Sequence, residues 1–555
     1  MNQPMIPIAA QGASRERKRQ RPKGRQVDAA ALQQVRALLG EAPRRRDLLI
    51  EYLHLIQDAH GCLSAPHLAA LAFELRLAQV EVFEVASFYH HFDIVREDEP
   101  RPPALTVRVC NGLSCEMAGA SHLLERLPAL LGREVRVLAA PCIGRCDQAP
   151  AALVGQAALG QASCESVAAA VAAGQITPAT AAVKADTKFA VLEACLSGER
   201  TVDAVIAELE GSGLRGLGGA GFPAGRKWRI VRKEPGPRLM AVNIDEGEPG
   251  TFKDRFYLER NPQQFIEGML IAAWAVEIDE IYVYLRDEYH DCRKLLEREL
   301  ARLDGRAPRI HLRRGAGAYI CGEESAMIES IEGKRGMPRL RPPYVAQKGL
   351  FGRPTLEHNF ETLYWVPEIL AKGAAWFNSH GRHGRQGLRS FSVSGRVKQP
   401  GVKLAPAGIT VRELIEEYCG GMQEGHQLYA YLPGGASGGI LPASMSDIPL
   451  DFDTLQPYGC FIGSAALIVL SQCDSARAAA SNMMRFFQHE SCGQCTPCRV
   501  GTAKAAALIG QPVWDAGLLG ELSQVMRDAS ICGLGQAAPN PVECVLKYFP
   551  HEVAR

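Results

Sequence analysis

The sequence has little that would place the protein in a membrane or on a nucleic acid. No apolar stretch approaches the roughly 18 residues of a membrane-spanning helix, and the best run, Gly268 to Val276, is much shorter. The formal net charge is only +1, and no secretory signal peptide is recognisable. We therefore expect no direct membrane insertion, no nucleic-acid partner and a cytoplasmic location.

The sequence is long and contains many cysteines. A chain of 555 residues exceeds what one hydrophobic core supports, so several domains are expected. Its 17 cysteines are grouped in short motifs, which favours a reducing compartment and metal ligation over disulfides. Charge is concentrated only in Ser14 to Gln26, which has seven basic residues and one acid. This composition predicts a disordered basic arm over residues 1–27, with docking to an acidic partner subunit as the alternative.

The clearest metal motif lies near the C-terminus. Cys492, Cys495 and Cys498 follow the spacing C-x2-C-x2-C, and Cys532 provides a distant fourth thiolate. Three sulfurs on one tight turn suit one face of a [4Fe–4S] cube, which a remote ligand then completes. A tetrahedral zinc ion is the alternative for four thiolates. With iron bound, the site would carry electrons.

A second set of cysteines follows two predicted strands. Leu105 to Val109 continues into Cys110 and Cys115, and Glu134 to Ala139 is followed by Cys142 and Cys146. With a helix predicted between the strands, the unit is βαβ-like and brings the C-x4-C and C-x3-C loops together. Four thiolates from two loops suit a [2Fe–2S] cluster, again with zinc as the alternative.

A small helical bundle is predicted before this unit. Apolar residues recur at helical spacing in Arg46 to Ala59, in the segment that Ser64 caps, and in Gln79 to Phe92. Its five histidines share no ligand spacing, so we expect surface or capping positions for His54, His60, His67, His90 and His91. This bundle, with Ala86-Ser87-Phe88-Tyr89, and the cysteine unit resemble the thioredoxin-like iron–sulfur subunit of respiratory complex I.

Three glycine-containing loops follow. The run from Gly216 to Gly225 matches G-x-G-x-x-G, but a helix precedes it where a dinucleotide fold requires a strand. Clustered glycines still let a backbone approach a phosphate or a planar ring, and Lys227 can pair with phosphate. The other two loops, Asn243 to Gly250 and Gly315 to Glu324, place glycines and carboxylates beyond predicted strands, where open α/β sheets bind ligands.

With His358 to Thr362, these loops resemble the flavin subunit of complex I, which binds FMN and NADH. The resemblance implies FMN contacts from Gly216, Gly218, Lys227, Asn243, Asp245, Tyr319, Glu323 and Asn359. It implies that Phe222, Glu248 and Glu324 face the nicotinamide nucleotide, and that Arg341 and Tyr344 lie around the adenine. The resemblance also implies cofactor-binding positions at Gly219, Gly221, Glu246, Gly322 and Thr362. His358 replaces a common asparagine, so no flavin contact is assigned to it.

The remaining segments resemble the later domains of the same family. Strands predicted from Ser390 to Leu432 resemble a ubiquitin-like β-grasp (SLBB-like) domain, and the chain from Ala478 is helical. Pro433 to Gly439 is rich in glycine but lacks the lysine and helix of a P-loop, so we interpret it as a structural turn.

The predicted fold is thus a multidomain α/β protein. Its domains are a basic arm, a helical bundle, a thioredoxin-like [2Fe–2S] domain, a linker, a Rossmann-like FMN/NAD domain, a β-grasp domain and a helical [4Fe–4S] domain. Their predicted bounds are 1–27, 28–100, 101–175, 176–200, 201–385, 386–470 and 471–555.

The resemblance implies an NAD-linked diaphorase with FMN, [2Fe–2S] and [4Fe–4S]. FMN is needed because nicotinamide exchanges two electrons as hydride whereas clusters pass single electrons. The protein positions these groups, so no catalytic side chain is expected. Among such proteins, the sequence over Arg45 to Leu71, Leu214 to Arg229 and Leu388 to Phe452 most resembles the β subunit of NAD-dependent formate dehydrogenase. This resemblance implies a hetero-oligomer with a molybdenum- or tungsten-pterin α subunit. Alternatives are the flavin subunit of an NAD-reducing hydrogenase, a fused complex I subunit, or a zinc-stabilised assembly scaffold.

Overall fold

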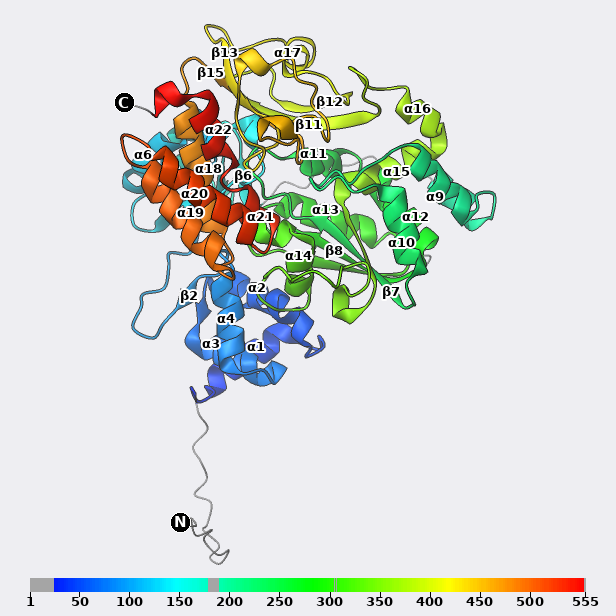
Figure 1. The fold of residues 1–555 in the computed structure, drawn as a ribbon. Coiled ribbons are helices and arrows are strands. Elements are labelled where there is room, and N and C mark those ends of the chain that lie inside the picture. Colours follow the sequence, from blue (N-terminus) through cyan, green and yellow to red (C-terminus); the bar gives the residue numbers. More distant parts are fainter. Residues whose placement is uncertain (1–23, 178–188, 304, 306, 554–555) are drawn as a thin grey trace, which may run out of the picture.

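The computed structural model describes residues 24–177, 189–303, 305 and 307–553. Most of the predicted basic arm therefore lies outside the described residues. The described chain forms a helical bundle, three sheet-containing domains and a C-terminal group of helices, all packed together (Figure 1). No helix within these ranges is both long enough and apolar enough to cross a bilayer.

The N-terminal bundle contains one helix more than the sequence indicated. Its helices are α1 (Ala29–Leu39), α2 (Leu49–His60), α3 (Ala65–Leu75) and α4 (Gln79–Phe88). Asp28 caps α1, and Ser64 caps α3 by accepting a hydrogen bond from the His67 amide, as predicted. The short strands β1 (Leu63–Ser64) and β2 (Ile94–Val95) pair in parallel beside the helices.

The thioredoxin-like domain is built on a four-stranded sheet in the order β4-β3-β5-β6. The pair β3–β4 is parallel and the other pairs are antiparallel. Its elements are β3 (Leu105–Cys110), α5 (Leu113–Met117), α6 (Ala120–Leu131), β4 (Val135–Ala140), β5 (Ala152–Val154), β6 (Ala157–Leu159) and α7 (Cys164–Ala172). The predicted βαβ-like unit is confirmed.

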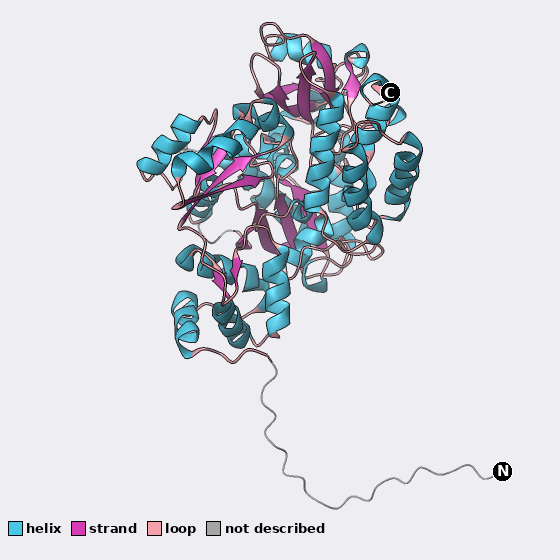
Figure 2. Cartoon of the chain, turned by 90° about the vertical axis from the view of Figure 1, so that its left-hand side faces the viewer, coloured by secondary structure: helices cyan, strands magenta, loops and turns pink. Residues whose placement is uncertain are grey.

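The strands lie in several separate groups among the helices (Figure 2). One of these groups is a parallel sheet in the order β10-β7-β8-β9. Its strands are β7 (Arg238–Ile244), β8 (Ile278–Leu285), β9 (Arg309–Arg314) and β10 (Thr355–Asn359). The surrounding helices are α8 (Ala190–Leu196), α9 (Val202–Gly211), α10 (Ala224–Lys233), α11 (Lys253–Arg260), α12 (Pro262–Val276), α13 (His290–Leu300), α14 (Glu324–Ile331), α15 (Phe360–Lys372) and α16 (Ala374–Asn378). Helix α8 falls inside the predicted linker because Leu192 and Cys195 are buried on this domain.

A five-stranded sheet in the order β12-β11-β15-β13-β14 makes up the β-grasp domain. Its elements are β11 (Leu388–Gly395), β12 (Gly401–Pro406), α17 (Val411–Glu413), β13 (Leu428–Leu432), β14 (Leu441–Pro442) and β15 (Ala466–Ser471). A capping box at Thr410 and Glu413 begins α17, and one π-helical turn, Leu414–Tyr418, extends it. The predicted strands are confirmed.

The C-terminal helices pack beside one another (Figure 1). They are α18 (Ala476–Glu490), α19 (Thr496–Ile509), α20 (Ala516–Ala529), α21 (Gly533–Ala537) and α22 (Asn540–Tyr548). Cys495 is the N-cap residue of α19 and Cys532 is that of α21. Both cysteines thus lie where a helix begins. The first backbone N–H groups of each helix, which have no acceptor within the helix, are therefore close to the cysteine.

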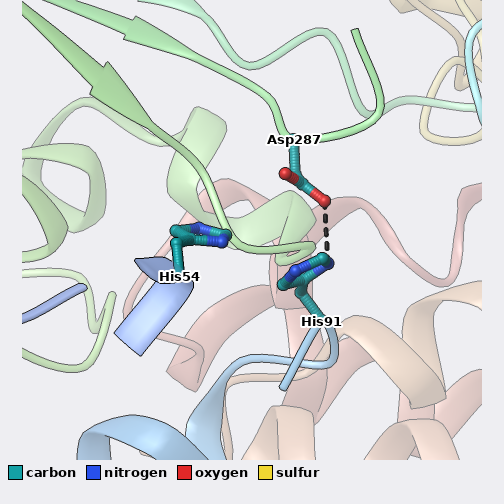
Figure 3. A group of neighbouring side chains, drawn as sticks. All are labelled: His54, His91 and Asp287. Atoms are coloured by element: carbon teal, nitrogen blue, oxygen red, sulfur yellow. Dashed lines mark ion pairs between the residues drawn. The ribbon is translucent and has the colours of Figure 1, made fainter. Parts of the chain in front are cut away.

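The bundle and the parallel-sheet domain meet at a buried polar cluster (Figure 3). His54 Nε2 lies 2.9 Å from the Gly315 carbonyl oxygen, and His91 Nδ1 lies 2.7 Å from Asp287 Oδ2. The other Asp287 oxygen accepts from the Arg314 guanidinium. Asp287 is satisfied on both oxygens, by His91 and Arg314, whereas His54 Nδ1 and His91 Nε2 have no hydrogen-bond partner among the described residues. Because the carboxylate is already paired, we interpret the cluster as an interface contact and not as a metal site.

Two of the histidines predicted to be surface or capping residues are buried instead. His54 is 2 % exposed because the parallel-sheet domain covers it, and His67 is 5 % exposed between Ser64 and Gln34. Burial lowers the pKa of His54 well below its usual range. Sequence spacing within the bundle could not reveal a cover supplied by another domain.

Candidate functional site

Two adjoining cavities lie at the carboxyl edge of the parallel sheet. Their volumes are about 650 Å³ and 320 Å³. Both are lined by Gly218, Ala220, Asn243, Gly322, Glu323 and Asn359. The three loops singled out in the sequence therefore meet at one site, as expected for an open α/β sheet.

The glycine loop folds back on itself to form one wall. The Gly216 amide donates to the Phe222 carbonyl at 2.8 Å, and Gly219 and Gly221 have positive φ angles of 124° and 66°. A Cβ on Gly218 would lie 2.9 Å from Asn359 Cβ. The loop therefore presents bare backbone to the cavity, the surface that a phosphate or a flat ring needs.

Thr362 does not line either cavity. It is 1 % exposed, and its Oγ1 accepts a hydrogen bond of 2.9 Å from the Leu217 amide. The structure therefore does not support the predicted cofactor contact of Thr362. Instead, Thr362 lies beneath the glycine loop and stabilises it through this hydrogen bond.

Charged side chains of both signs line the larger cavity. Lys227 Nζ lies 3.1 Å from Glu357 Oε2, and Arg341 lies 2.8 Å from Glu324 Oε1 and also pairs with Glu323. Burial and the nearby Glu357 raise the pKa of Glu324. A phosphate in this cavity would meet Lys227 and Arg341, which are now paired with carboxylates, and those carboxylates can accept from hydroxyl or amide groups.

Two aromatic rings project at this cavity with much of their surface exposed. Phe222 is 39 % exposed and Tyr344 is 57 % exposed, although both belong to the cavity wall. The Arg226 guanidinium carbon lies 5.8 Å from the centre of the Phe222 ring. A planar ring bound here would cover apolar surface that now faces solvent.

The smaller cavity contains an unsatisfied acid. Asp245 Oδ2 is buried and has no hydrogen-bond partner among the described residues, and burial raises the pKa of Asp245 well above its usual range. Asn243 Oδ1 accepts from the Asp245 amide at 2.9 Å, while Asn243 Nδ2 donates to the Gly322 carbonyl at 2.8 Å. An unpaired acceptor beside the glycine loop fits a ligand with N–H or O–H groups, as a flavin ring and its ribityl chain have.

Two predicted binding acids have structural partners. Glu246 accepts from the Asp254 amide at 2.8 Å and from Tyr289 Oη at 2.8 Å, and burial raises its pKa to about 7. Glu323 accepts from the Ala326 amide at 2.9 Å and caps α14. Both line the smaller cavity, but their carboxylates already hold the ends of helices.

The first predicted cysteine set converges. Cys110, Cys115, Cys142 and Cys146 are between 1 % and 6 % exposed, and the Sγ atoms of Cys142 and Cys146 are 3.3 Å apart. The adjacent Cys115 and Cys142 thiols raise the pKa of Cys110 well above its usual range. Four sulfurs in one buried place are a donor set that fits a [2Fe–2S] cluster.

The second set converges beside the smaller cavity. A Cβ on Gly535, three residues after Cys532, would lie 2.8 Å from Cys498 Cβ, so the distant ligand is brought to the triplet. Burial raises the pKa of Cys532 to about 12, which a bound metal ion would reverse. Gly533 and Leu534, directly after Cys532, line the smaller cavity.

Four family models match separate parts of the chain. The Nuo51 FMN-binding domain model matches residues 209–368, and the NADH-ubiquinone oxidoreductase-F iron-sulfur binding region matches 478–555. The thioredoxin-like [2Fe-2S] ferredoxin model matches 35–175, and the SLBB domain model matches 390–441.

Curated relatives match about two thirds of the chain. An NADH-quinone oxidoreductase subunit of Rhizobium meliloti is 41 % identical over 64 % of this chain and 89 % of its own length. NADH dehydrogenase [ubiquinone] flavoprotein 1 of Dictyostelium discoideum is 41 % identical over 63 % of this chain and 78 % of its own length. The chain belongs to this family of complex I flavoproteins.

A solved structure extends the likeness to the N-terminal domains. A chain of an NAD+-reducing [NiFe]-hydrogenase in the H2-reduced state has a TM-score of 0.81 and 33 % identity, covering 92 % of this chain and 93 % of that chain. The predicted multidomain α/β fold is confirmed. This member of the flavoprotein family also carries the thioredoxin-like [2Fe–2S] domain, and its domain families bind FMN, [2Fe–2S] and [4Fe–4S].

Sequence reasoning missed Lys253 in this flavoprotein. It lines the smaller cavity although it is 1 % exposed, and its Nζ lies 2.8 Å from Asp254 Oδ1 and 3.0 Å from Glu361 Oε2. Burial opposes its charge, but the two carboxylates prevail and raise the pKa of Lys253. The sequence signal that could have indicated this position is the charged run Lys253-Asp254-Arg255, which is separated by two residues from the acidic glycine loop Asn243 to Gly250.

The β-grasp domain also reaches the site. Ser437 and Ser464 line the smaller cavity, Ser437 from the glycine-rich segment that we interpreted as a structural turn. That interpretation is wrong in part, because the segment also forms cavity wall. The absence of a lysine excluded a P-loop but did not exclude contact with a neighbouring domain.

Proposed function

We propose that this chain is a diaphorase module, which transfers electrons between NAD(H) and its iron–sulfur clusters through FMN. The observation that supports this most is the position of the smaller cavity between the two cysteine sets. On one side, α21 follows Cys532 and lines the cavity. On the other side, a void of about 10 Å³ is lined by Cys142 together with Asp245 and Tyr319 of the cavity wall.

FMN, when bound, supplies the conversion between a two-electron hydride exchange and single-electron transfers. The backbone of the glycine loop and Lys227 would hold its phosphate, while Asn243, Asp245 and Asn359 would orient it. The remaining proposed FMN contacts come from the same wall: Gly216, Gly218, Gly219, Gly221, Tyr319, Gly322 and Glu323. None of these side chains acts as an acid or base in the reaction, so the chain contributes position and charge.

The nicotinamide nucleotide would occupy the larger cavity. Phe222 and Tyr344 would stack on its planar parts, and Arg341 would meet its phosphates. Glu324 in the larger cavity and Glu248 in the adjoining smaller cavity would accept hydrogen bonds from its amide or hydroxyl groups, so the nucleotide would extend from the larger cavity into the smaller one. The eight cysteines of the two sets would ligate the clusters.

For the partner, we propose the molybdenum- or tungsten-containing subunit of an NAD-dependent formate dehydrogenase, with this chain as β subunit. Support comes from three stretches whose sequence resembles that β subunit, namely Arg45 to Leu71, Leu214 to Arg229 and Leu388 to Phe452. The intact first cysteine set supports the same partner. Electrons from formate would enter through the [4Fe–4S] cluster and reduce NAD+. A hydrogenase flavin subunit is the second candidate, favoured by the similar solved structure that spans 92 % of this chain.

The test is to purify the native complex, identify its large subunit by mass spectrometry, and measure NAD+ reduction with formate and with hydrogen. Formate-dependent reduction with a pterin subunit supports the first candidate, and hydrogen-dependent reduction supports the second. NADH-dependent dye reduction with flavin absorbance would exclude the zinc-stabilised scaffold. A colourless, iron-free protein without such activity would refute the diaphorase proposal.

A further inference from the structure

A carboxylate in the smaller cavity is held by a domain that is distant in sequence. Glu248 lies on the loop after β7, in the parallel-sheet domain. Its Oε1 accepts from the Ser437 amide at 3.1 Å and also from the Ser437 hydroxyl. Its Oε2 accepts from the Ser464 hydroxyl at 3.1 Å. All three donors belong to the β-grasp domain.

The donors are themselves fixed. Because the Ser464 hydroxyl donates to Glu248, it accepts from Thr251, whose Oγ1 lies 2.8 Å away. The Ser437 carbonyl accepts from Asn540 Nδ2 at 3.0 Å, which ties the loop to α22. Each hydroxyl therefore has a defined direction.

The glycines of this loop permit the close approach. Gly435 has a φ of 73°, and a Cβ there would lie 2.8 Å from Glu248 Cδ. Any side chain at this position would push the carboxylate away. The Glu248 side chain thus accounts for Gly435, whereas Gly434 and Gly438 are required by close packing against Phe461 and against each other.

No cation neutralises Glu248 among the ion pairs of the described residues. Neutral donors alone stabilise its charge, and they determine where its oxygens point. Burial raises the pKa of Glu248, while the Ser437 and Ser464 hydrogen bonds oppose that shift. An acceptor without a counter-ion keeps its remaining lone pairs available to a ligand in the cavity.

We propose that Ser437 and Ser464 are positioning residues, by which the β-grasp domain holds Glu248 in the orientation that binds the nicotinamide nucleotide. This inference rests on the proposed diaphorase function and deepens it. The β-grasp domain is then part of the NADH site and not only a connector between the flavin and [4Fe–4S] domains.

The experiment uses the full-length holoprotein and NADH-dependent reduction of ferricyanide. Ser437→Ala and Ser464→Ala should each raise the KM for NADH about tenfold, the effect of a lost hydrogen bond to a charged group, with little change in kcat and unchanged FMN content. Ser437→Thr keeps the hydroxyl and should restore the KM. Ser446→Ala removes a buried hydroxyl of the same domain that bonds Arg412, and it should leave the KM unchanged.

Coupling to Glu248 separates positioning from general loosening of the domain. On a Glu248→Gln background, Ser437→Ala should add little, because the charge that it orients is gone. An equal rise in KM on both backgrounds, or no rise in either serine variant, would overturn the inference. Absence of NADH-dependent activity in the unmodified holoprotein would instead refute the proposed function.

Discussion

Replacing Lys253 with methionine tests the buried charge network under the smaller cavity. Methionine keeps most of the side-chain volume but removes the ammonium group that faces Asp254 and Glu361, at 2.8 Å and 3.0 Å. Both carboxylates are 1 % exposed and cannot be solvated in its place. Removing one partner of a buried ion pair costs about 3–5 kcal/mol, which corresponds to a loss of about 6–20 °C in melting temperature for a domain of this size.

The assay is thermal unfolding followed by flavin fluorescence and circular dichroism. Lys372→Met removes an exposed pair with Glu368 and should change the midpoint by no more than about 1–2 °C. Burial raises the pKa of Asp254, and Lys253 opposes that rise. Without Lys253, the folded-state pKa should lie still further above the unfolded value. The deficit should therefore shrink as pH falls, because folding then takes up a proton.

A second substitution sharpens the interpretation. Asp254→Asn on the Lys253→Met background removes one of the uncompensated charges and should recover part of the lost stability. A midpoint no lower than that of the Lys372→Met control, or a deficit that does not depend on pH, would contradict the view that this network is a balanced buried charge cluster.

Three further outcomes are expected. Gly218→Ala should reduce FMN retention several-fold, measured by released-flavin fluorescence, because its Cβ would lie 2.9 Å from Asn359 Cβ. Full retention would refute the proposal that the bare backbone of the glycine loop binds FMN. Cys532→Ser should abolish the [4Fe–4S] electron paramagnetic resonance signal and leave the [2Fe–2S] signal, whereas Cys146→Ser should do the reverse; loss of both signals in each variant would contradict two independent sites. Glu248→Gln should raise the KM for NADH while FMN stays bound, and unchanged kinetics would refute its assignment.

Local patterns were sufficient for much of the fold. The alternation at Leu105 to Val109, the cap at Ser64 and the strand before Asn243 all appear where periodicity and capping placed them. The cysteine spacing also sufficed to predict that Cys532 joins the triplet, because ligation of one cluster requires it. These features depend on neighbours in sequence or on the chemistry of one motif.

The errors share a different cause. His54 is buried by a loop from another domain, and Ser437 reaches the cavity only after the β-grasp domain docks. No motif singled out Lys253, whose charge is compensated by Glu361 from a helix that is distant in sequence. Composition and periodicity describe one segment at a time, whereas these positions are decided by contacts between segments.

The docking of the thioredoxin-like domain has a consequence for dilute solution. Arg255 donates to the Gly144 carbonyl at 2.9 Å, and Arg286 donates to the Cys142 carbonyl at 2.6 Å. The flavin domain therefore binds the cysteine loop directly. In a complex built from separate chains, that contact would weaken as subunits dissociate. Here the covalent link keeps its local concentration high, so the spacing between this cluster site and the flavin cavity is independent of protein concentration.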